Sequence, residues 1–309
     1  MAVDVTNRAF LRRYAWISIA AAVATIALKT GAYLLTGSVG LLSDAVESLV
    51  NLAGALMALW MLTVAAREPD EQHAFGHSKA EYFSSGVEGT LIVAAAISIA
   101  VAAVDRLRSP RPLEQIGLGL TVAVGASVVN LFVSRVLMNA GRRFQSVTLE
   151  AGARHLLADV WTTGGVVAAL GAVSLTGWQW LDPVIGLVVA GNIVLTGFHI
   201  VRESIGGLMD TALPAAERER LRAVIERHAT DGIQFHALRT RRSGARAFLT
   251  VHVLVPGDWT VHRGHQLLEQ IEADVRAALP GLTVFTHLES LEDPTSWEDQ
   301  HLDRPSAER

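Results

Sequence analysis

Apolar residues run in six long blocks between residues 14 and 206, separated by short polar breaks. The blocks cover residues 14–36, 39–66, 83–106, 114–138, 148–175 and 180–206. Each block reaches or exceeds the ~20 residues that a helix needs to cross a hydrocarbon core of ~30 Å. Because lipid offers no partners for unpaired backbone groups, we expect helices rather than open strands. The pattern predicts an all-α bundle of six transmembrane helices.

The pattern changes after Met209. Residues 214–229 and 260–278 have helical spacing, and Pro214 stands near the start of the first of these helices. Residues 233–242 and 245–255 alternate like strands around a Ser243-Gly244 turn, and residues 282–290 form a third strand. The order α-β-β-α-β predicts a small α+β domain, metallochaperone-like, with helices on one face of a sheet.

These patterns divide the chain into three parts. We expect a transmembrane domain over residues 1–209, a cytoplasmic α+β domain over 210–292, and an acidic, disordered tail over 293–309. Arginines precede the first apolar block, but no small-residue cleavage site follows it, so we interpret that block as a retained helix rather than a signal peptide.

Composition supports a membrane protein and limits its chemistry. Of the 309 residues, 50% are hydrophobic, the net charge is −4 and the mean hydropathy is +0.34. The chain has no cysteine. This excludes disulfide scaffolds, thiolate zinc sites and cysteine nucleophiles, so a bound metal must take His, Asp, Glu, Asn or backbone ligands.

Basic residues in the loops predict the orientation of the helices. The N-terminus, the 67–82 and 139–147 loops and the segment after the last helix carry lysines and arginines, whereas two loops on the other side carry none. The third, with Arg106, Arg108 and Arg111, argues the other way. The balance predicts that both termini are cytoplasmic in the inner (plasma) membrane.

Polar side chains inside the second and fifth helices indicate an ion path, because such groups are costly in lipid. Glu47 and Asn51 are four residues apart, as are His155 and Asp159, so each pair shares one helix face. Asp44 lies about one turn before Glu47 and is a possible extra ligand. An imidazole with oxygen ligands suits zinc, iron(II) or cobalt.

Two structural roles compete with this metal site. Asn51 could make an interhelical hydrogen bond, and Glu47 could balance the charge of Lys29 in the first helix. Because two ligand-type pairs at helical spacing occur on different helices, we favour a metal site.

Two further groups outside the membrane are candidate metal ligands. The 67–82 loop carries Asp70, His73 and His77, which form either a second site or an ordinary solvated loop. The α+β domain carries His236, His252, His265, His287 and Glu289. Three of these histidines lie on the three predicted strands and could converge across one sheet, although scattered surface histidines are equally compatible with the pattern.

Three motifs together resemble the cation diffusion facilitator family, of the bacterial zinc and iron efflux type. They are SVGLLSDAVESLVN in the second helix, HAFGHSKAEYF in the loop after it and HLLAD in the fifth helix. The resemblance covers residues 14 to 290. It implies a homodimeric antiporter that exports zinc or a related divalent ion in exchange for protons.

The resemblance also implies three sites. The transport site would be Glu47, Asn51, His155 and Asp159; the loop site Asp70, His73 and His77; and the cytoplasmic site, where metal would help to lock the dimer, His236, His252, His265, His287 and Glu289.

This chain departs from the family pattern in its ligands. Zinc members place two aspartates where the second helix has Glu47 and Asn51, and an aspartate where Glu289 stands, while Leu288 replaces a polar neighbour. An amide removes one negative charge, which could move selectivity from zinc toward iron(II), cobalt or manganese. His155 argues against a purely manganese site, since hard ions favour oxygen shells.

The sequence favours a secondary transporter over an enzyme. We expect metal/proton antiport by alternating access, with zinc as the main ion, iron(II), cobalt, manganese or cadmium as alternatives, and partners limited to a second copy, lipid, metal ions and protons, without nucleic acid. An intramembrane metallohydrolase would need an HExxH arrangement, which is missing here. A membrane-anchored metal sensor or scaffold would not need Glu47, Asn51, His155 and Asp159 in its anchor.

Overall fold

The structure is a computed structural model and describes residues 9–36, 39–109, 116–178, 180–230, 232–298 and 300. Contacts divide the chain into two compact units, with the division between Gly206 and Gly207. The first unit is helical and the second is a small α+β domain. The predicted fold class is confirmed.

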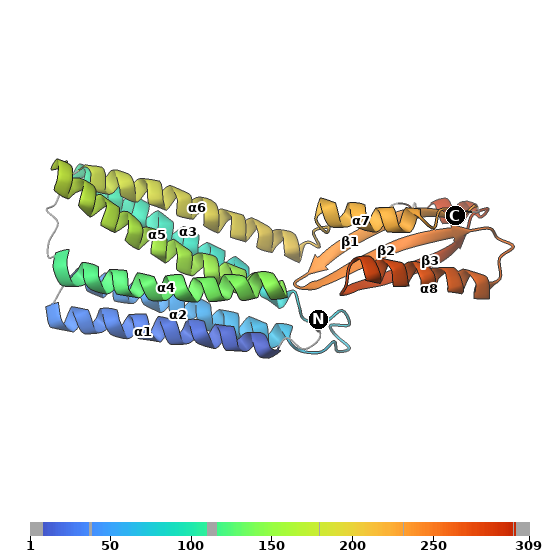
Figure 1. Cartoon of the computed structure of the whole chain (residues 1–309), viewed down its shortest axis with the longest axis horizontal. Helices are drawn as coiled ribbons and strands as arrows, with labels where there is room; N and C mark the ends of the chain where they lie inside the picture. The colour runs from blue at the N-terminus through green and yellow to red at the C-terminus, as the bar shows by residue number, and fades with distance from the viewer. Residues whose placement is uncertain are drawn as a thin grey trace, which may run out of the picture. The chain divides into compact units, whose positions relative to one another are not determined.

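Six long helices form the first unit and lie side by side (Figure 1). Their bounds are α1 Arg12–Thr36, α2 Val39–Ala65, α3 Ala80–Arg108, α4 Ile116–Phe144, α5 Val147–Thr176 and α6 Leu181–Leu208. The closest packing joins α1 to α2 and α4 to α5, and α3 packs against α2 and α5. These contacts bring α2, α3 and α5 together, and those three helices carry most of the polar residues discussed below.

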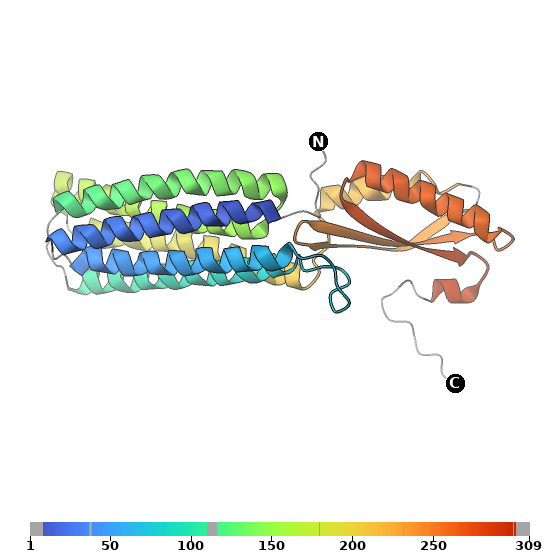
Figure 2. The same cartoon turned by 90° about the horizontal axis from the view of Figure 1, so that it is seen from below.

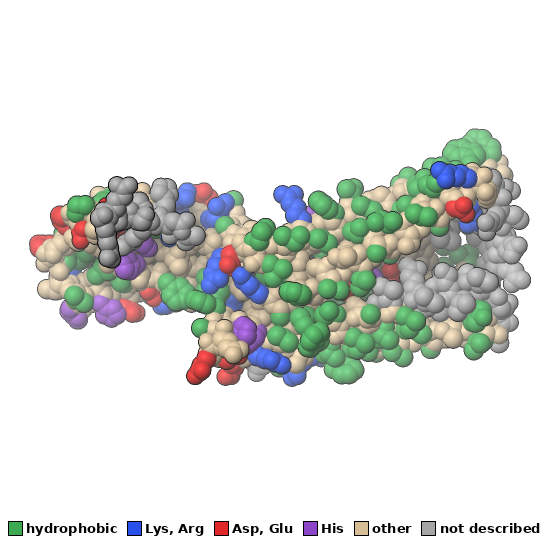
Figure 3. All heavy atoms as spheres, turned by 180° about the vertical axis from the view of Figure 1, so that it is seen from behind, with side chains coloured by type: hydrophobic (Ala, Val, Ile, Leu, Met, Phe, Trp, Pro, Cys, Tyr) green, Lys and Arg blue, Asp and Glu red, His purple; other side chains and the backbone are tan. Residues whose placement is uncertain are grey.

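The outer surface of the bundle is apolar. Large hydrophobic side chains such as Trp60, Phe132 and Phe198 are more than half exposed, and Figure 3 shows hydrophobic side chains over much of the visible face of the bundle. Five stretches of the described helices are long and apolar enough to cross a membrane: Ala9–Leu34, Ala80–Arg108, Leu120–Phe144, Val147–Val173 and Pro183–Leu208. In α2, the apolar stretch Asn51–Ala65 is shorter than these five.

The connection between α4 and α5 is shorter than the 139–147 loop predicted from sequence. Helix α4 continues to Phe144, so Arg142 and Arg143 lie in its last turn. Cations are favourable there because the carbonyl end of a helix is partially negative. Gln145 then takes a left-handed conformation, with φ of 50°. Ser146 caps α5 by accepting a hydrogen bond from the backbone N–H of Leu149.

The second unit contains a three-stranded sheet with helices on one face (Figure 2). Its elements are α7 Ala215–Glu226, β1 Gln234–Ser243, β2 Arg246–Val255, α8 Val261–Ala278 and β3 Leu282–Ser290. The strand order is β1-β2-β3. The β1–β2 pair is an antiparallel hairpin, whereas β3 runs parallel to β2, so the chain must cross over through α8. A buried core, including Leu221, Val251 and Ile271, joins the helices to the sheet.

The predicted tail begins with ordered structure. Residues Pro294–Trp297 form a short 3-10 helix, η2, capped by Asp293, whose side chain accepts a hydrogen bond from the backbone N–H of Thr295. The indole N–H of Trp297 donates to the carbonyl of Leu291 at 3.0 Å. The Asp293 cap and the Trp297 hydrogen bond thus order residues 294–297, although the composition of the segment is acidic. Residues 299 and 301–309 lie outside the described structure.

Candidate metal centres

A group of polar side chains lies inside the helical unit, and two of them hydrogen-bond to the carboxylate of Asp159. Asp159 on α5 accepts a hydrogen bond from the amide of Asn51 on α2 at 2.5 Å and another from the amide of Asn130 on α4 at 3.2 Å. Both amides donate to the same oxygen, Oδ2. The structure therefore brings Asn51 and Asp159 together, as the sequence predicted, and adds Asn130, which is only 7% exposed.

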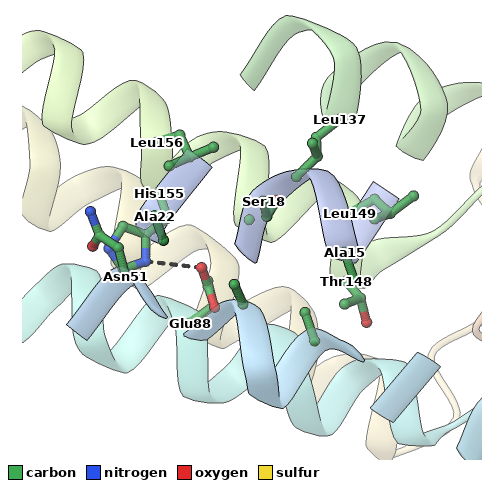
Figure 4. A pocket seen from close by; sticks show the side chains of 13 residues that line it. Ala15, Ser18, Ala22, Asn51, Glu88, Leu137, Thr148, Leu149, His155 and Leu156 are labelled. Carbon is green, nitrogen blue, oxygen red and sulfur yellow. Dashed lines mark ion pairs between the residues drawn. The ribbon is translucent and has the colours of Figure 1, made fainter. Parts of the chain in front are cut away.

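His155 belongs to the same group and lies one helical turn before Asp159 on α5. It is 4% exposed, and its Nδ1 lies 3.0 Å from Oε1 of Glu88 on α3, which is 6% exposed. Figure 4 shows Asn51 on one side of the imidazole ring and Glu88 on the other. We call the five residues Asn51, Glu88, Asn130, His155 and Asp159 the bundle cluster.

Glu88 and Asn130 were missed by the sequence analysis. Each is a polar residue within a long apolar block, which is the signal that identified the other members of the cluster. Neither has a second ligand-type residue four positions away, and neither belongs to the motifs that carry the family resemblance. Applying the cost of burial to single residues as well as to pairs would have identified both.

Small side chains leave space beside the bundle cluster. A cavity of about 30 Å³ is lined by Asn51, Glu88 and His155, and alanines on α1 and α2, including Ala22 and Ala55, contribute to its wall. This volume exceeds the ~10–15 Å³ that a cavity needs to hold one water molecule. The space thus suits a single ion or water rather than an organic substrate.

Asp44 and Glu47 belong to α2, but their side chains lie outside the described part of the structure. Both residues remain predictions as ligands.

The loop between α2 and α3 brings its three candidate ligands together. Nδ1 of His73 lies 3.1 Å from Oδ1 of Asp70, and Nε2 of His77 lies 3.3 Å from Oδ2 of the same carboxylate. A backbone hydrogen bond from His73 is the largest cause of a lowered pKa of Asp70. A carboxylate that stays charged, flanked by two imidazoles, could bind a divalent ion. We call these residues the loop cluster.

In the α+β domain, strand register aligns three histidines. His236 pairs with His252 across the antiparallel ladder, and His252 pairs with His287 across the parallel ladder. Glu289, two residues after His287, therefore lies on the same face of the sheet. Its carboxylate is 2.9 Å from Nε2 of His236, 3.3 Å from Nδ1 of His252 and 3.4 Å from Nε2 of His287.

These four residues, which we call the sheet cluster, form a typical donor set for a transition metal. Imidazole nitrogens and a carboxylate are zinc ligands, and the ligand atoms of His236, His252 and Glu289 lie within 4.8 Å of one another. Glu289 is 8% exposed, so the acidic centre of the cluster is largely shielded from water.

The structure does not bring the fifth predicted residue, His265, into the sheet cluster. His265 is an exposed residue on α8. Among the described residues, it is not part of a group of His, Asp and Glu side chains close enough to hold one metal ion. The ring of Trp297 instead packs edge-on against His236, with ring centroids 5.8 Å apart. His265 remains a prediction.

Comparison with known proteins identifies the family. The model of the cation efflux transmembrane domain matches residues 15–209, and that of the cation efflux protein cytoplasmic domain matches residues 213–291. The chain belongs to the cation diffusion facilitator family. Within this family, it is 52% identical to an uncharacterized transporter of Synechocystis over 96% of both chains. It is 30% identical to the cation-efflux pump FieF of Klebsiella pneumoniae, over 92% of this chain and 93% of FieF.

Solved structures match a limited share of this chain. A zinc-form structure of CzrB is 36% identical, with a TM-score of 0.26, and covers 27% of this chain and 96% of that one. Membership of the family, together with the apolar helices, makes this protein a membrane transporter of divalent metal cations.

Proposed function

We propose that this cation diffusion facilitator exports zinc in exchange for protons. The observation that carries the proposal is the bundle cluster, in which the buried side chains of Glu88, Asn130 and His155 lie with the half-buried side chains of Asn51 and Asp159 among apolar helices. Such groups are expensive to keep in a membrane unless they serve an ion path. The transport ligands are His155 and Asp159 on α5 and Asn51 and Glu47 on α2.

Proton exchange follows from coordination chemistry. Imidazole nitrogens and carboxylate oxygens bind a metal only in their deprotonated form, so metal entering the site displaces protons, and protons arriving from the other side displace metal. Alternating access would join these two half-reactions, with the helices moving around the site. Both termini are on the cytoplasmic side, where the ion enters.

The loop and sheet clusters bind metal outside the membrane. In a homodimer, a metal ion held by His236, His252, His287 and Glu289 would stiffen the cytoplasmic domain against its partner copy. We include His265 as a candidate ligand that could contribute in the metal-bound state. The loop cluster of Asp70, His73 and His77 would bind an ion near the cytoplasmic entrance.

The transport proposal is tested in proteoliposomes. Uptake of Zn²⁺ and the accompanying pH change inside the vesicles are recorded together, for the wild type and for His155→Ala and Asp159→Ala. Both variants should lose metal-driven proton flux. His199→Ala is a matched control, since His199 is an exposed histidine on α6, and it should keep the flux.

Full activity of both His155→Ala and Asp159→Ala would reject the site. Metal binding without any transport in the wild type would instead favour the sensor alternative. Competition among Zn²⁺, Fe²⁺, Co²⁺, Mn²⁺ and Cd²⁺ in the same vesicles identifies the preferred ion.

A further inference from the structure

A carboxylate from α3 faces the transport histidine, although the transport ligands proposed above come only from α2 and α5. Oε1 of Glu88 lies 3.0 Å from Nδ1 of His155, and both side chains are less than 10% exposed. In Figure 4, Asn51 lies on the other side of the imidazole ring from Glu88, and all three residues line one cavity.

The helices around Glu88 are shaped to admit its carboxylate. A Cβ atom placed on Gly54 of α2 would lie 2.7 Å from Oε2 of Glu88, and the nearest atoms around that position all belong to Glu88. Gly152 of α5 also faces the carboxylate, with its Cβ position 4.0 Å from Oε1. Any side chain at position 54 would therefore displace Glu88.

We propose that Glu88 is a positioning residue for metal binding by His155. Nδ1 lies 3.0 Å from the carboxylate without the alignment of a hydrogen bond, so a small turn of the ring would let the carboxylate accept the Nδ1–H and would fix one tautomer and one ring orientation. Nε2 is then the nitrogen presented toward Asn51 and Asp159, where the ion binds. Histidines that ligate metals commonly donate their second N–H to a carboxylate in this way.

The arrangement also explains how the site works with Asn51 in place of a carboxylate. The amide of Asn51 carries no charge, whereas Glu88 contributes a negative charge next to the imidazole. A carboxylate acceptor makes the imidazole a stronger donor to the ion. The inference rests on the proposed transport site and adds a residue from a third helix to it.

The test measures Zn²⁺ affinity of the full-length chain in nanodiscs by competition with a chromophoric chelator. The background carries His73→Ala and His236→Ala, which remove a ligand from the loop and sheet clusters. Glu88→Ala should weaken binding by about 10-fold to 100-fold, the usual effect of losing such a partner. The Zn²⁺ affinity of Glu88→Gln should lie between that of Glu88→Ala and that of the background protein.

Glu81→Gln is the matched control. Glu81 is also a fully buried glutamate on α3, but it accepts hydrogen bonds from Ser146 and from the backbone N–H of Thr148. Its replacement should change the affinity by less than about threefold, because its hydrogen bonds are made with Ser146 and Thr148 at the start of α5.

Gly54→Ala tests the contact without removing the charge. It should weaken binding because the new methyl group displaces the carboxylate of Glu88. In the double variant Gly54→Ala/Glu88→Ala the effect should not exceed that of Glu88→Ala alone, since both changes act on one contact. Additive losses would overturn the proposal.

A spectroscopic measurement separates positioning from general stability. The ¹⁵N signals of His155, identified by their loss in His155→Gln, should show the Nδ1–H tautomer in the metal-free background protein and a shift toward the Nε2–H tautomer in Glu88→Ala. Unchanged signals would overturn the proposal, as would unchanged affinity of Glu88→Ala when Asp159→Ala has lost binding. If Asp159→Ala also keeps its affinity, the transport site itself is wrong.

Discussion

The bundle cluster and the sheet cluster combine similar ligand types in opposite ways. In the bundle, side chains from four helices converge, and a single histidine, 4% exposed, is surrounded by carboxylates and amides. In the sheet, three histidines share one carboxylate, and the side chain of His287 is 62% exposed. In the sheet cluster the side chains of His236 and His252 are only 9% and 17% exposed. We expect reversible exchange of metal for protons at the bundle cluster, which has one imidazole, and firmer retention of metal at the sheet cluster, which has three.

The largest expected effect comes from the carboxylate on which the bundle cluster converges. Asp159→Asn keeps the shape of the side chain but removes the charge that the amides of Asn51 and Asn130 hydrogen-bond. Zn²⁺ transport into proteoliposomes should fall more than about 100-fold, which exceeds the usual cost of losing an outer-shell partner. Transport at half the wild-type rate would show that the ion bypasses Asp159.

The comparison is sharpened by removing the central histidine of the sheet cluster. His252 pairs with both His236 and His287, so His252→Ala should lower the zinc retained by the full-length chain, measured by elemental analysis after gel filtration. Affinity at this site should drop by about 100-fold. Transport should fall far less, because the bundle cluster is intact.

His262→Ala and His265→Ala complete this experiment. His262 is an exposed histidine on α8 and serves as the control, whose zinc content should equal that of the wild type. His265→Ala decides whether the fifth predicted residue binds metal. A loss of zinc equal to that in His252→Ala would make His265 a ligand in the metal-bound protein.

A gain of charge at the bundle cluster should strengthen zinc binding. Asn51→Asp would place a second carboxylate at hydrogen-bonding distance from Asp159, where the two negative charges repel unless a cation or proton lies between them. We expect the Zn²⁺ affinity to rise by about tenfold, since a charge at this distance contributes a few kcal/mol at most. Competition between Zn²⁺ and Fe²⁺ measures this change. Equal Zn²⁺ affinities of Asn51→Asp and the wild type would show that Asn51 is outside the ligand shell.

The smallest effect is expected in the loop cluster. Asp70 is exposed, and its lowered pKa comes mainly from the backbone N–H of His73. A lowered pKa keeps the carboxylate charged from neutral pH down to below its ordinary value, so the Asp70 contacts should be lost only under strongly acidic conditions. Asp70→Asn should reduce the transport rate by less than about threefold, as for exposed ion pairs. A large loss would move this loop into the transport path.

Much of the fold was predictable because each element has its own periodicity. Long apolar blocks predicted the six helices, and alternation predicted the strands and their α-β-β-α-β order. The helix end at Phe144 and the turn formed by Pro294–Trp297 were not predicted. Both depend on local caps and one aromatic contact, which composition does not reveal.

The candidate metal ligands likewise include some that the sequence predicted and others that only the packing of helices or strands brings together. Spacing of four residues places His155 and Asp159 on one helix face, so this pair was readable without a structure. The chain by itself thus determined the membrane helices, the absence of thiolate ligands and the ligand-type pairs.

Only the tertiary structure decided which elements face one another. Glu88 is 67 residues before His155 along the chain, and helix packing alone places them in contact. In the sheet, the register aligns His236, His252 and His287, whereas His265 on α8 stays outside the row. The physical reason is that periodicity describes one element at a time, while a metal site depends on the packing of several.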